Sequence, residues 1–150
     1  KQEFGDIKGI TDKGYYDNSF HVSSRINMSP FDKLRLEALG HKYSAGGHIS
    51  YIETDSLTKN LEAIPDILRY AKMVGIHYMG INQPVDKCHI CGYKGEFTAT
   101  KEGFTCPQCG NHDSNEMSVI RRVCGYLSQP NARPFNKGKQ EEIMHRVKHS

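Results

Sequence analysis

The fold of this chain is decided by the stretch that opens with Cys88-His89-Ile90-Cys91-Gly92 and closes with Cys106-Pro107-Gln108-Cys109-Gly110. Each end has the pattern C-x2-C-G, which lets two sulfurs converge on one ion and ends in a glycine that tolerates left-handed backbone. Together the two turns supply four thiolates, a closed tetrahedral shell with no position for water or substrate. The spacing therefore predicts a structural zinc site formed by Cys88, Cys91, Cys106 and Cys109.

Other ligands and another metal compete with this interpretation. His89 and His112 are alternative zinc ligands, and a rubredoxin-like iron site is the alternative metal centre. Because both cysteine pairs match one template, the all-cysteine zinc shell is favoured. Residues 95–100 and 103–105 predict a hairpin between the turns, so that the whole is a zinc ribbon, whose negative charge nearby lysines can offset: Lys87, Lys94 and Lys101.

Upstream of the ribbon, residues 49–81 predict a strand, a helix and a second strand. The alternation in residues 49–53 is typical of a strand, and residues 76–81 form the second. Between them, a helix capped by Asp55 or Ser56 ends at Gly75, with a kink or break near residues 61–65 because Pro65 removes a backbone hydrogen bond. This order is compatible with a parallel crossover that belongs to a larger sheet.

The two ends of the chain carry weaker patterns. Residues 1–28 are predicted to be mostly loop with one short strand around residues 20–22. Ser29 can cap a helix that has Pro30 in its first turn and stops at Gly40. After the ribbon, residues 119–124 have the β-branched content of a strand, turn residues follow at 128–131, and a last helix is expected from about 139 to 149. A lone glycine such as Gly125 usually marks a bulge, a turn or a close backbone approach.

Composition limits the class of protein. A chain of 150 residues, 25% charged and 37% hydrophobic, is large enough for one core, and so for one domain or one and a small appendage. The net charge of +3 is mild and the basic residues are spread along the chain, which argues against direct binding of nucleic acid. No apolar run approaches the ~20 residues of a membrane-spanning helix, and residues 1–5 lack the apolar region of a secretory signal. Five cysteines, in two close pairs and one single, favour metal ligation in a reducing compartment, and so a cytoplasmic protein.

Several motifs occur in the order found in one enzyme family. Arg122-Val123-Cys124-Gly125-Tyr126-Leu127 is followed by Arg133-Pro134-Phe135-Asn136-Lys137-Gly138-Lys139-Gln140-Glu141-Glu142. Upstream lie the cysteine pairs, Gly46-Gly47-x-Ile49 and Tyr16-x-Asn18-Ser19-Phe20-His21. Over nearly its whole length, the chain resembles the C-terminus of the anaerobic (class III) ribonucleoside-triphosphate reductases.

This resemblance implies that Gly125 carries a glycyl radical. With no Cβ, a glycine Cα radical can lie flat and delocalise into both neighbouring amides. In the family, a separate iron–sulfur enzyme that uses S-adenosylmethionine removes the hydrogen, and the stored radical then generates a cysteine thiyl radical that attacks the ribose of a nucleoside triphosphate. Cys124 is not expected to be that thiyl, because the family's cysteine lies well upstream and adjacent strand residues point to opposite faces. Cys124 is expected to be a small packing residue.

The resemblance also implies an α/β fold in three parts. Residues 1–82 would be the C-terminal part of the reductase barrel, 83–115 the zinc ribbon, and 116–150 the glycyl radical loop with a terminal helix. Asn18, Ser19, His21, Gly46 and Gly47 match barrel positions, which implies a part in lining the active site. The family is several times longer than this chain, so the expected partners are the upstream barrel with its thiyl cysteine, the activating enzyme, the nucleotide substrate and a second copy in a homodimer.

Two other functions are alternatives to a role as the radical-bearing portion of the reductase. One is a free-standing spare part that repairs an oxygen-cleaved glycyl radical enzyme, and the resemblance within residues 1–80 counts against it. The other is a zinc-ribbon module for nucleic acid, against which the scattered charge and the lack of aromatic residues within a basic patch both count.

Overall fold

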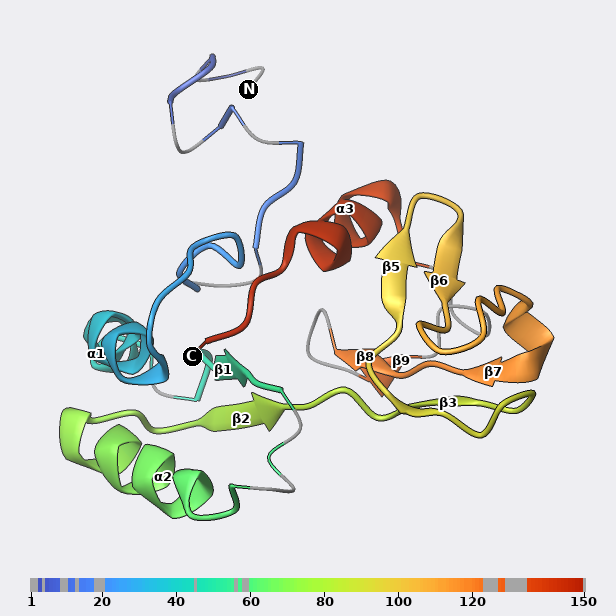
Figure 1. The fold of residues 1–150 in the computed structure, drawn as a ribbon. Coiled ribbons are helices and arrows are strands. Elements are labelled where there is room, and N and C mark those ends of the chain that lie inside the picture. Colours follow the sequence, from blue (N-terminus) through green and yellow to red (C-terminus); the bar gives the residue numbers. More distant parts are fainter. Residues whose placement is uncertain are drawn as a thin grey trace.

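The computed structural model describes residues 3, 5–8, 11–12, 14–17, 21–44, 46–55, 57, 60–122, 127–128 and 135–149. Figure 1 shows two groups of elements, with α1, α2, β1 and β2 in one half of the molecule and β3 to β7 in the other. Helix α3 lies beside β5, and the C-terminal end of the chain returns to β1 (Figure 1). The mixture of helices and small sheets agrees with the predicted α/β class.

The first half is built on a parallel strand–helix–strand unit, as predicted. β1 (Ser50–Glu53) and β2 (Met79–Asn82) are joined by α2 (Ala63–Val74), and they pair in parallel from Ser50 opposite Met79 to Glu53 opposite Asn82. α1 (Pro30–His41) packs against α2. The core between these elements is made of the buried side chains Leu34, Ile52, Ile67 and Ala71.

Helix boundaries in this half differ from the predictions where the local signals are ambiguous. Ser29 caps α1 as expected, accepting a hydrogen bond from the Asp32 N–H at 3.1 Å, but α1 continues through Gly40 to His41. α2 begins at Ala63 and not at residues 55–56, so Pro65 lies in its first turn, where its missing N–H would have no partner within the helix. Gly75 ends α2 in the left-handed conformation, with a φ of 88°.

Two predicted strands also differ from the structure. The second strand of the parallel pair begins at Met79 instead of residue 76. In the region predicted to hold a short strand, residues 21–28 contain none, and residues 18–20 lie outside the described residues.

The second half is the predicted ribbon. β3 (Asp86–Cys88), β4 (Lys94–Gly95) and β7 (Met117–Ser118) form a three-stranded antiparallel sheet in the order β4-β3-β7, and η2 (Ser114–Glu116) precedes β7. β5 (Thr98–Thr100) and β6 (Gly103–Thr105) form the expected hairpin. Gly92 and Gly110 have φ of 74° and 72°, the left-handed backbone predicted for the end of each cysteine turn. The ribbon has its own core of Cys88, Phe97, Cys106, Met117 and Val119.

The last part of the chain forms a second small hairpin and a helix. β8 (Arg121–Arg122) pairs antiparallel with β9 (Leu127–Ser128), so the strand predicted at 119–124 is shorter than expected within the described residues. α3 (Lys137–His145) starts where Asn136 caps it, its side chain accepting from the Lys139 N–H at 3.0 Å. It ends before the predicted residue 149, and residues 146–149 leave it as non-helical chain.

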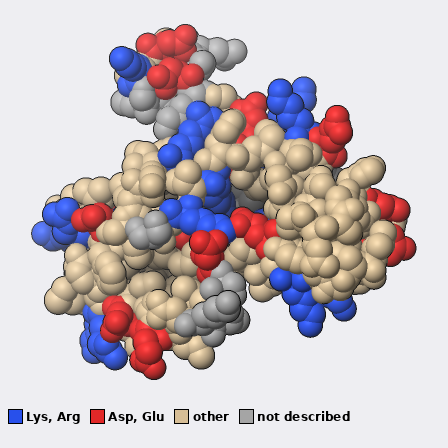
Figure 2. All heavy atoms as spheres, in the orientation of Figure 1, with Lys and Arg blue, Asp and Glu red and all other residues tan. Residues whose placement is uncertain are grey.

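The surface agrees with the mild net charge. On the face drawn in Figure 2, acidic side chains lie beside basic ones instead of leaving one broad basic area. Among the described residues, no helix combines the length and apolar character required to cross a bilayer.

Candidate functional site

The four predicted metal ligands converge at one end of the ribbon. The sulfurs of Cys88, Cys91, Cys106 and Cys109 all lie within 4.8 Å of one another. Cys88 Sγ is 3.7 Å from Cys109 Sγ, and Cys91 Sγ is 3.6 Å from Cys106 Sγ. Tetrahedral Zn–S bonds of about 2.3 Å place neighbouring sulfurs about 3.8 Å apart, whereas a disulfide needs about 2.0 Å. The four cysteines therefore fit a tetrahedral metal ion and are not paired as disulfides.

The surroundings of the sulfurs favour binding of a cation. The Cys91 N–H, together with the Ile90 N–H and against the effect of burial, lowers the pKa of Cys88 to about 6. The Tyr93 N–H lowers the pKa of Cys91, but burial and the three other cysteines raise it to about 12. Four thiolates thus repel one another unless a cation neutralises them, and a divalent ion such as zinc does so.

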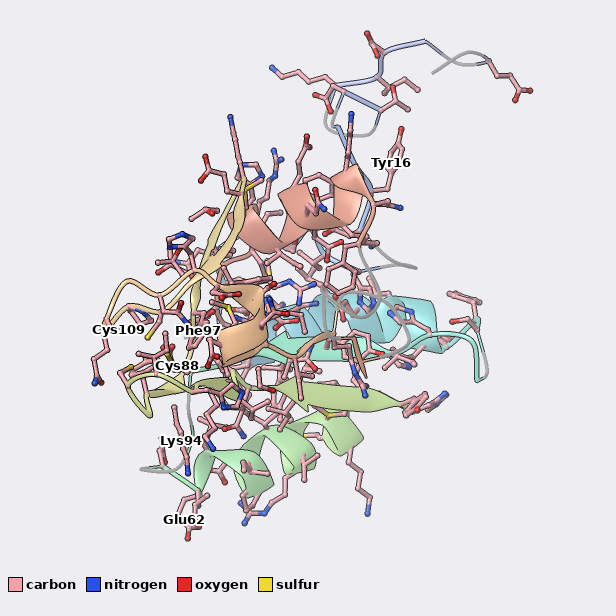
Figure 3. All side chains as sticks on the ribbon, turned by 90° about the vertical axis from the view of Figure 1, so that its right-hand side faces the viewer. Tyr16, Glu62, Cys88, Lys94, Phe97 and Cys109 are labelled. Carbon is pink, nitrogen blue, oxygen red and sulfur yellow. The ribbon has the colours of Figure 1, made fainter. Side chains whose placement is uncertain are left out.

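The competing histidine ligands lie elsewhere on the ribbon. His89 and His112 are both exposed, and neither belongs to the group of metal-binding side chains formed by the four cysteines. Figure 3 shows Cys88 and Cys109 together at the ribbon end of the molecule. Because four cysteine sulfurs fill a tetrahedral coordination shell, a metal ion bound here has no coordination position left for a catalytic water.

A buried ion pair joins the ribbon to the hairpin β8–β9. The Asp86 side chain, at the start of β3, is fully buried and accepts hydrogen bonds from the Phe97 N–H at 2.8 Å and from Arg121 Nη2 at 2.5 Å. Arg121 Nη1 bonds the other carboxylate oxygen, and the guanidinium also lies 5.1 Å from the centre of the Phe104 ring. The position of β8 is therefore set by the ribbon.

Gly125 belongs to the segment 123–126, which connects β8 to β9 and lies outside the described residues together with Cys124. The base of the hairpin is described, with Arg121 opposite Ser128 and Arg122 opposite Leu127. The strand pairing fixes both ends of the segment that contains Gly125.

The structure brings together some of the N-terminal residues that were predicted to line the active site. Asn18 and Ser19 lie outside the described residues. His21 is close to the glycine turn, because its ring lies 5.6 Å from that of His48, the residue after Gly47. A Cβ at Gly46 or Gly47 would meet no atom within 4 Å, so the turn borders open space.

Sequence reasoning missed the buried ion pair beside His21. Glu37 Oε1 accepts from the Val22 N–H at 2.9 Å and from Lys33 Nζ, and His21 Nδ1 is 3.6 Å from the same oxygen. Burial raises the pKa of Glu37, but the nearby His21 ring and the bonded Lys33 ammonium outweigh it and hold the value at about 2. A Lys–Glu pair four residues apart on a helix is normally a surface feature, so nothing in the local sequence indicates that both side chains are buried.

The donor atoms of His21, Glu37 and His48 also lie within 4.8 Å of one another. The ammonium group of Lys33 already neutralises the only carboxylate in this group. A second cation there would be repelled at short range, so this cluster is not a metal centre comparable to the four cysteines.

Tyr51 links the His21 region to the base of the hairpin. The centre of its ring lies 5.5 Å from that of His21, and the Arg122 guanidinium lies 5.5 Å from the same Tyr51 ring centre. A cleft of about 750 Å³ opens beside Arg122 between the two halves of the molecule. Its other cations, Arg121, Arg146 and Lys148, already bond carboxylates.

Comparisons with known proteins give matches of one kind. The family model described as anaerobic ribonucleoside-triphosphate reductase matches residues 1–149. The chain is 51% identical over 147 residues to the anaerobic ribonucleoside-triphosphate reductase of Escherichia coli (strain K12), covering 98% of this chain and 20% of that protein. It is 49% identical over 148 residues to the enzyme of the same name from Enterobacteria phage T4, covering 99% of this chain and 24% of that protein.

A solved structure shares the fold. The structure named anaerobic ribonucleotide reductase superposes with a TM-score of 0.60 at 23% sequence identity, over 86% of this chain and 19% of that one. The chain therefore spans about a fifth of the length of the relatives that it matches.

Proposed function

The chain belongs to the family of anaerobic ribonucleoside-triphosphate reductases, and from this premise we propose that it is the portion of such an enzyme that stores a glycyl radical on Gly125. The observation that carries the proposal is the pairing of Arg122 with Leu127, which holds both ends of the segment around Gly125 on a hairpin fixed to the ribbon. A short segment fixed at both ends can present one Cα at a defined depth. Such placement is what hydrogen-atom transfer between two groups requires.

In this proposal the stored radical starts the reduction of ribonucleotides to deoxyribonucleotides. A separate iron–sulfur enzyme that uses S-adenosylmethionine removes one hydrogen atom from the Gly125 Cα. The glycyl radical then takes a hydrogen atom from a cysteine thiol in the upstream barrel, which leaves a thiyl radical facing the ribose. Four of the five cysteines of this chain converge on the predicted metal site, and Cys124 is expected to be a packing residue, so the thiol comes from the upstream barrel.

The remaining parts have supporting roles. The ribbon, predicted as residues 83–115 and extended in the structure by β7 and Val119, is proposed to hold a structural zinc ion on its four cysteines. Residues 1–82 complete the barrel, and 116–150 present the radical loop. His21 and the turn at Gly46 and Gly47, with Asn18 and Ser19, are proposed to line the active site, and the contact between the His21 and His48 rings supports their grouping. The reduced, metal-spaced cysteines support the proposed cytoplasmic location, and the family resemblance supports a homodimer.

Reconstitution tests the proposal. The chain is combined anaerobically with the upstream part of a reductase, the activating enzyme, S-adenosylmethionine, a reductant and a ribonucleoside triphosphate, and deoxyribonucleotide is measured by chromatography. We expect product only when both polypeptides are present, and none with the Gly125→Ala chain. Product formed at the wild-type rate with Gly125→Ala would refute the assignment.

A further inference from the structure

The C-terminal segment 146–149 crosses from α3 to the end of β1 and binds there. The His149 N–H donates to the Glu53 carbonyl at 2.8 Å, and the Glu53 N–H donates to His149 Nδ1 at 2.9 Å. Lys148 bonds the carboxylates of Asp55 and Glu96, one from each half of the molecule. Figure 1 shows this end of the chain beside β1. The segment is therefore attached to the parallel unit by main chain and side chains.

Arg146, the first residue of this segment, bonds three separate parts of the fold. Its Nη1 donates to the Arg122 carbonyl at 2.8 Å and to Glu53 Oε1 at 2.9 Å, and its Nη2 donates to Glu142 Oε1 at 2.5 Å. The side chain is only 17% exposed. Because the Arg122 carbonyl belongs to the peptide bond that leads into residue 123, this contact lies at the entrance to the segment that contains Gly125.

The chemistry of the guanidinium explains why an arginine fits this position. Its planar fork can donate to several acceptors at once, whereas a lysine ammonium is a single compact charge. The carboxylates of Glu53 and Glu142 hold the guanidinium in place, and a carbonyl oxygen accepts from it more strongly than from a neutral donor. β1 and α3 are thereby tied to the chain just before Gly125.

We propose that Arg146 is a positioning residue for the radical loop, the segment 123–126 that contains Gly125: it holds the Arg122 carbonyl against β1 and so fixes the point at which the chain enters this segment. The radical part of this inference rests on the proposed function, whereas the anchoring of the peptide bond does not. The ion pair of Arg121 fixes the hairpin to the ribbon, and Arg146 fixes it to the parallel unit. The two contacts together define the position of β8 relative to both halves.

Limited trypsin digestion tests the anchoring without any radical chemistry. Trypsin cleaves after arginine, and the carbonyl of the bond between Arg122 and Val123 is the acceptor of the Arg146 contact. We expect Arg146→Gln to accelerate cleavage at this bond by about tenfold, the effect of losing a charged hydrogen bond, as measured by mass spectrometry relative to total loss of intact chain. Arg146→Lys should give an intermediate rate.

The same variants are activated anaerobically with the upstream polypeptide, and the radical is quantified by electron paramagnetic resonance. Arg146→Gln should lower the radical yield several-fold while zinc content stays at the wild-type level, and Arg146→Lys should restore part of the yield. Arg69→Gln, which removes an exposed cation bonded to Asp66 on α2, is the matched control and should behave as wild type.

Three outcomes would overturn the proposal or a defined part of it. Unchanged cleavage after Arg122 in Arg146→Gln would refute the anchoring. Faster cleavage at all sites, with a matching loss of thermal stability and zinc, would show that Arg146 only stabilises the fold. A wild-type protein that forms no radical, while Arg146→Gln still accelerates cleavage after Arg122, would refute the proposed function and the radical role but leave the anchoring intact.

Discussion

Arg121 and Asp86, which are 35 residues apart in the chain, form a buried bidentate ion pair. Asp86 belongs to the same strand as the predicted metal ligand Cys88, and Arg121 belongs to the strand that leads toward Gly125. The metal site and the hairpin are therefore connected by two short strands and one ion pair. In the proposed function, this connection lets the ribbon position the hairpin whose connecting segment contains Gly125.

Removing the carboxylate charge of this pair should destabilise the protein strongly. Asp86→Asn leaves the Arg121 guanidinium largely buried without its counter-charge, a change that typically costs about 3 kcal/mol or more. The free energy of unfolding from urea denaturation, with zinc present, measures the effect. The matched control is Asp66→Asn, which breaks the exposed pair with Arg69 and should cost less than about 1 kcal/mol. Equal losses in both variants would contradict the role assigned to the buried pair.

Metal content should depend on the cysteines and not on the nearby histidines. Cys88→Ser removes one of four ligands, so zinc measured by atomic spectroscopy should fall well below one ion per chain and the ribbon should unfold. His89→Ala and His112→Ala change exposed side chains outside the cluster and should retain the metal. Iron in place of zinc in protein purified without added metal would instead support the rubredoxin-like alternative.

Acid should weaken the attachment of the C-terminal segment through His149. Burial and the nearby Lys33 lower the pKa of His149 to about 4, below the value of 6.5 expected for an exposed histidine. The unfolded chain therefore takes up this proton first, and stability is lost as the pH falls from about 6.5 toward about 4. We expect the unfolding free energy to fall less steeply between pH 7 and 5 in His149→Gln than in wild type.

The matched control for this experiment is His89→Gln, an exposed histidine of the ribbon. Comparison with wild type at each pH removes the contribution of metal release, which all three proteins share. An identical slope in wild type and His149→Gln would show that the His149 proton is not coupled to folding.

The ribbon could be predicted from the sequence because its determinants are local. The cysteine spacing, the glycines after each cysteine pair and the hairpin between them all lie within Cys88 to Gly110. The structure shows the four sulfurs close together, the left-handed glycines and the hairpin. The predicted start of α2, at residues 55–56, was wrong because Leu57 and Leu61 extend the apolar helical pattern upstream of the observed start at Ala63. Pro65 indicates a helix start close to the observed one, since proline is well tolerated only in the first turn of a helix.

Contacts between distant segments could not be predicted in the same way. Residues 146–149 continue the polar pattern of the last helix, but Arg146 bonds Glu53, which is 93 residues away in sequence. Lys33 and Glu37 have the spacing of a surface pair, and only the tertiary structure buries them. Nothing in the local sequence identifies the partner of such a charge, so the anchoring of the hairpin became visible only in the structure.

Electron paramagnetic resonance of the activated protein tests the central claim most directly. The chain, combined anaerobically with the upstream polypeptide and the activating enzyme, should give a doublet from the single hydrogen that remains on the Gly125 Cα. The doublet should collapse to a singlet in protein made with α-deuterated glycine, and it should be absent from Gly125→Ala protein that retains its zinc. A doublet of wild-type intensity in the Gly125→Ala protein would contradict the claim that Gly125 stores the radical.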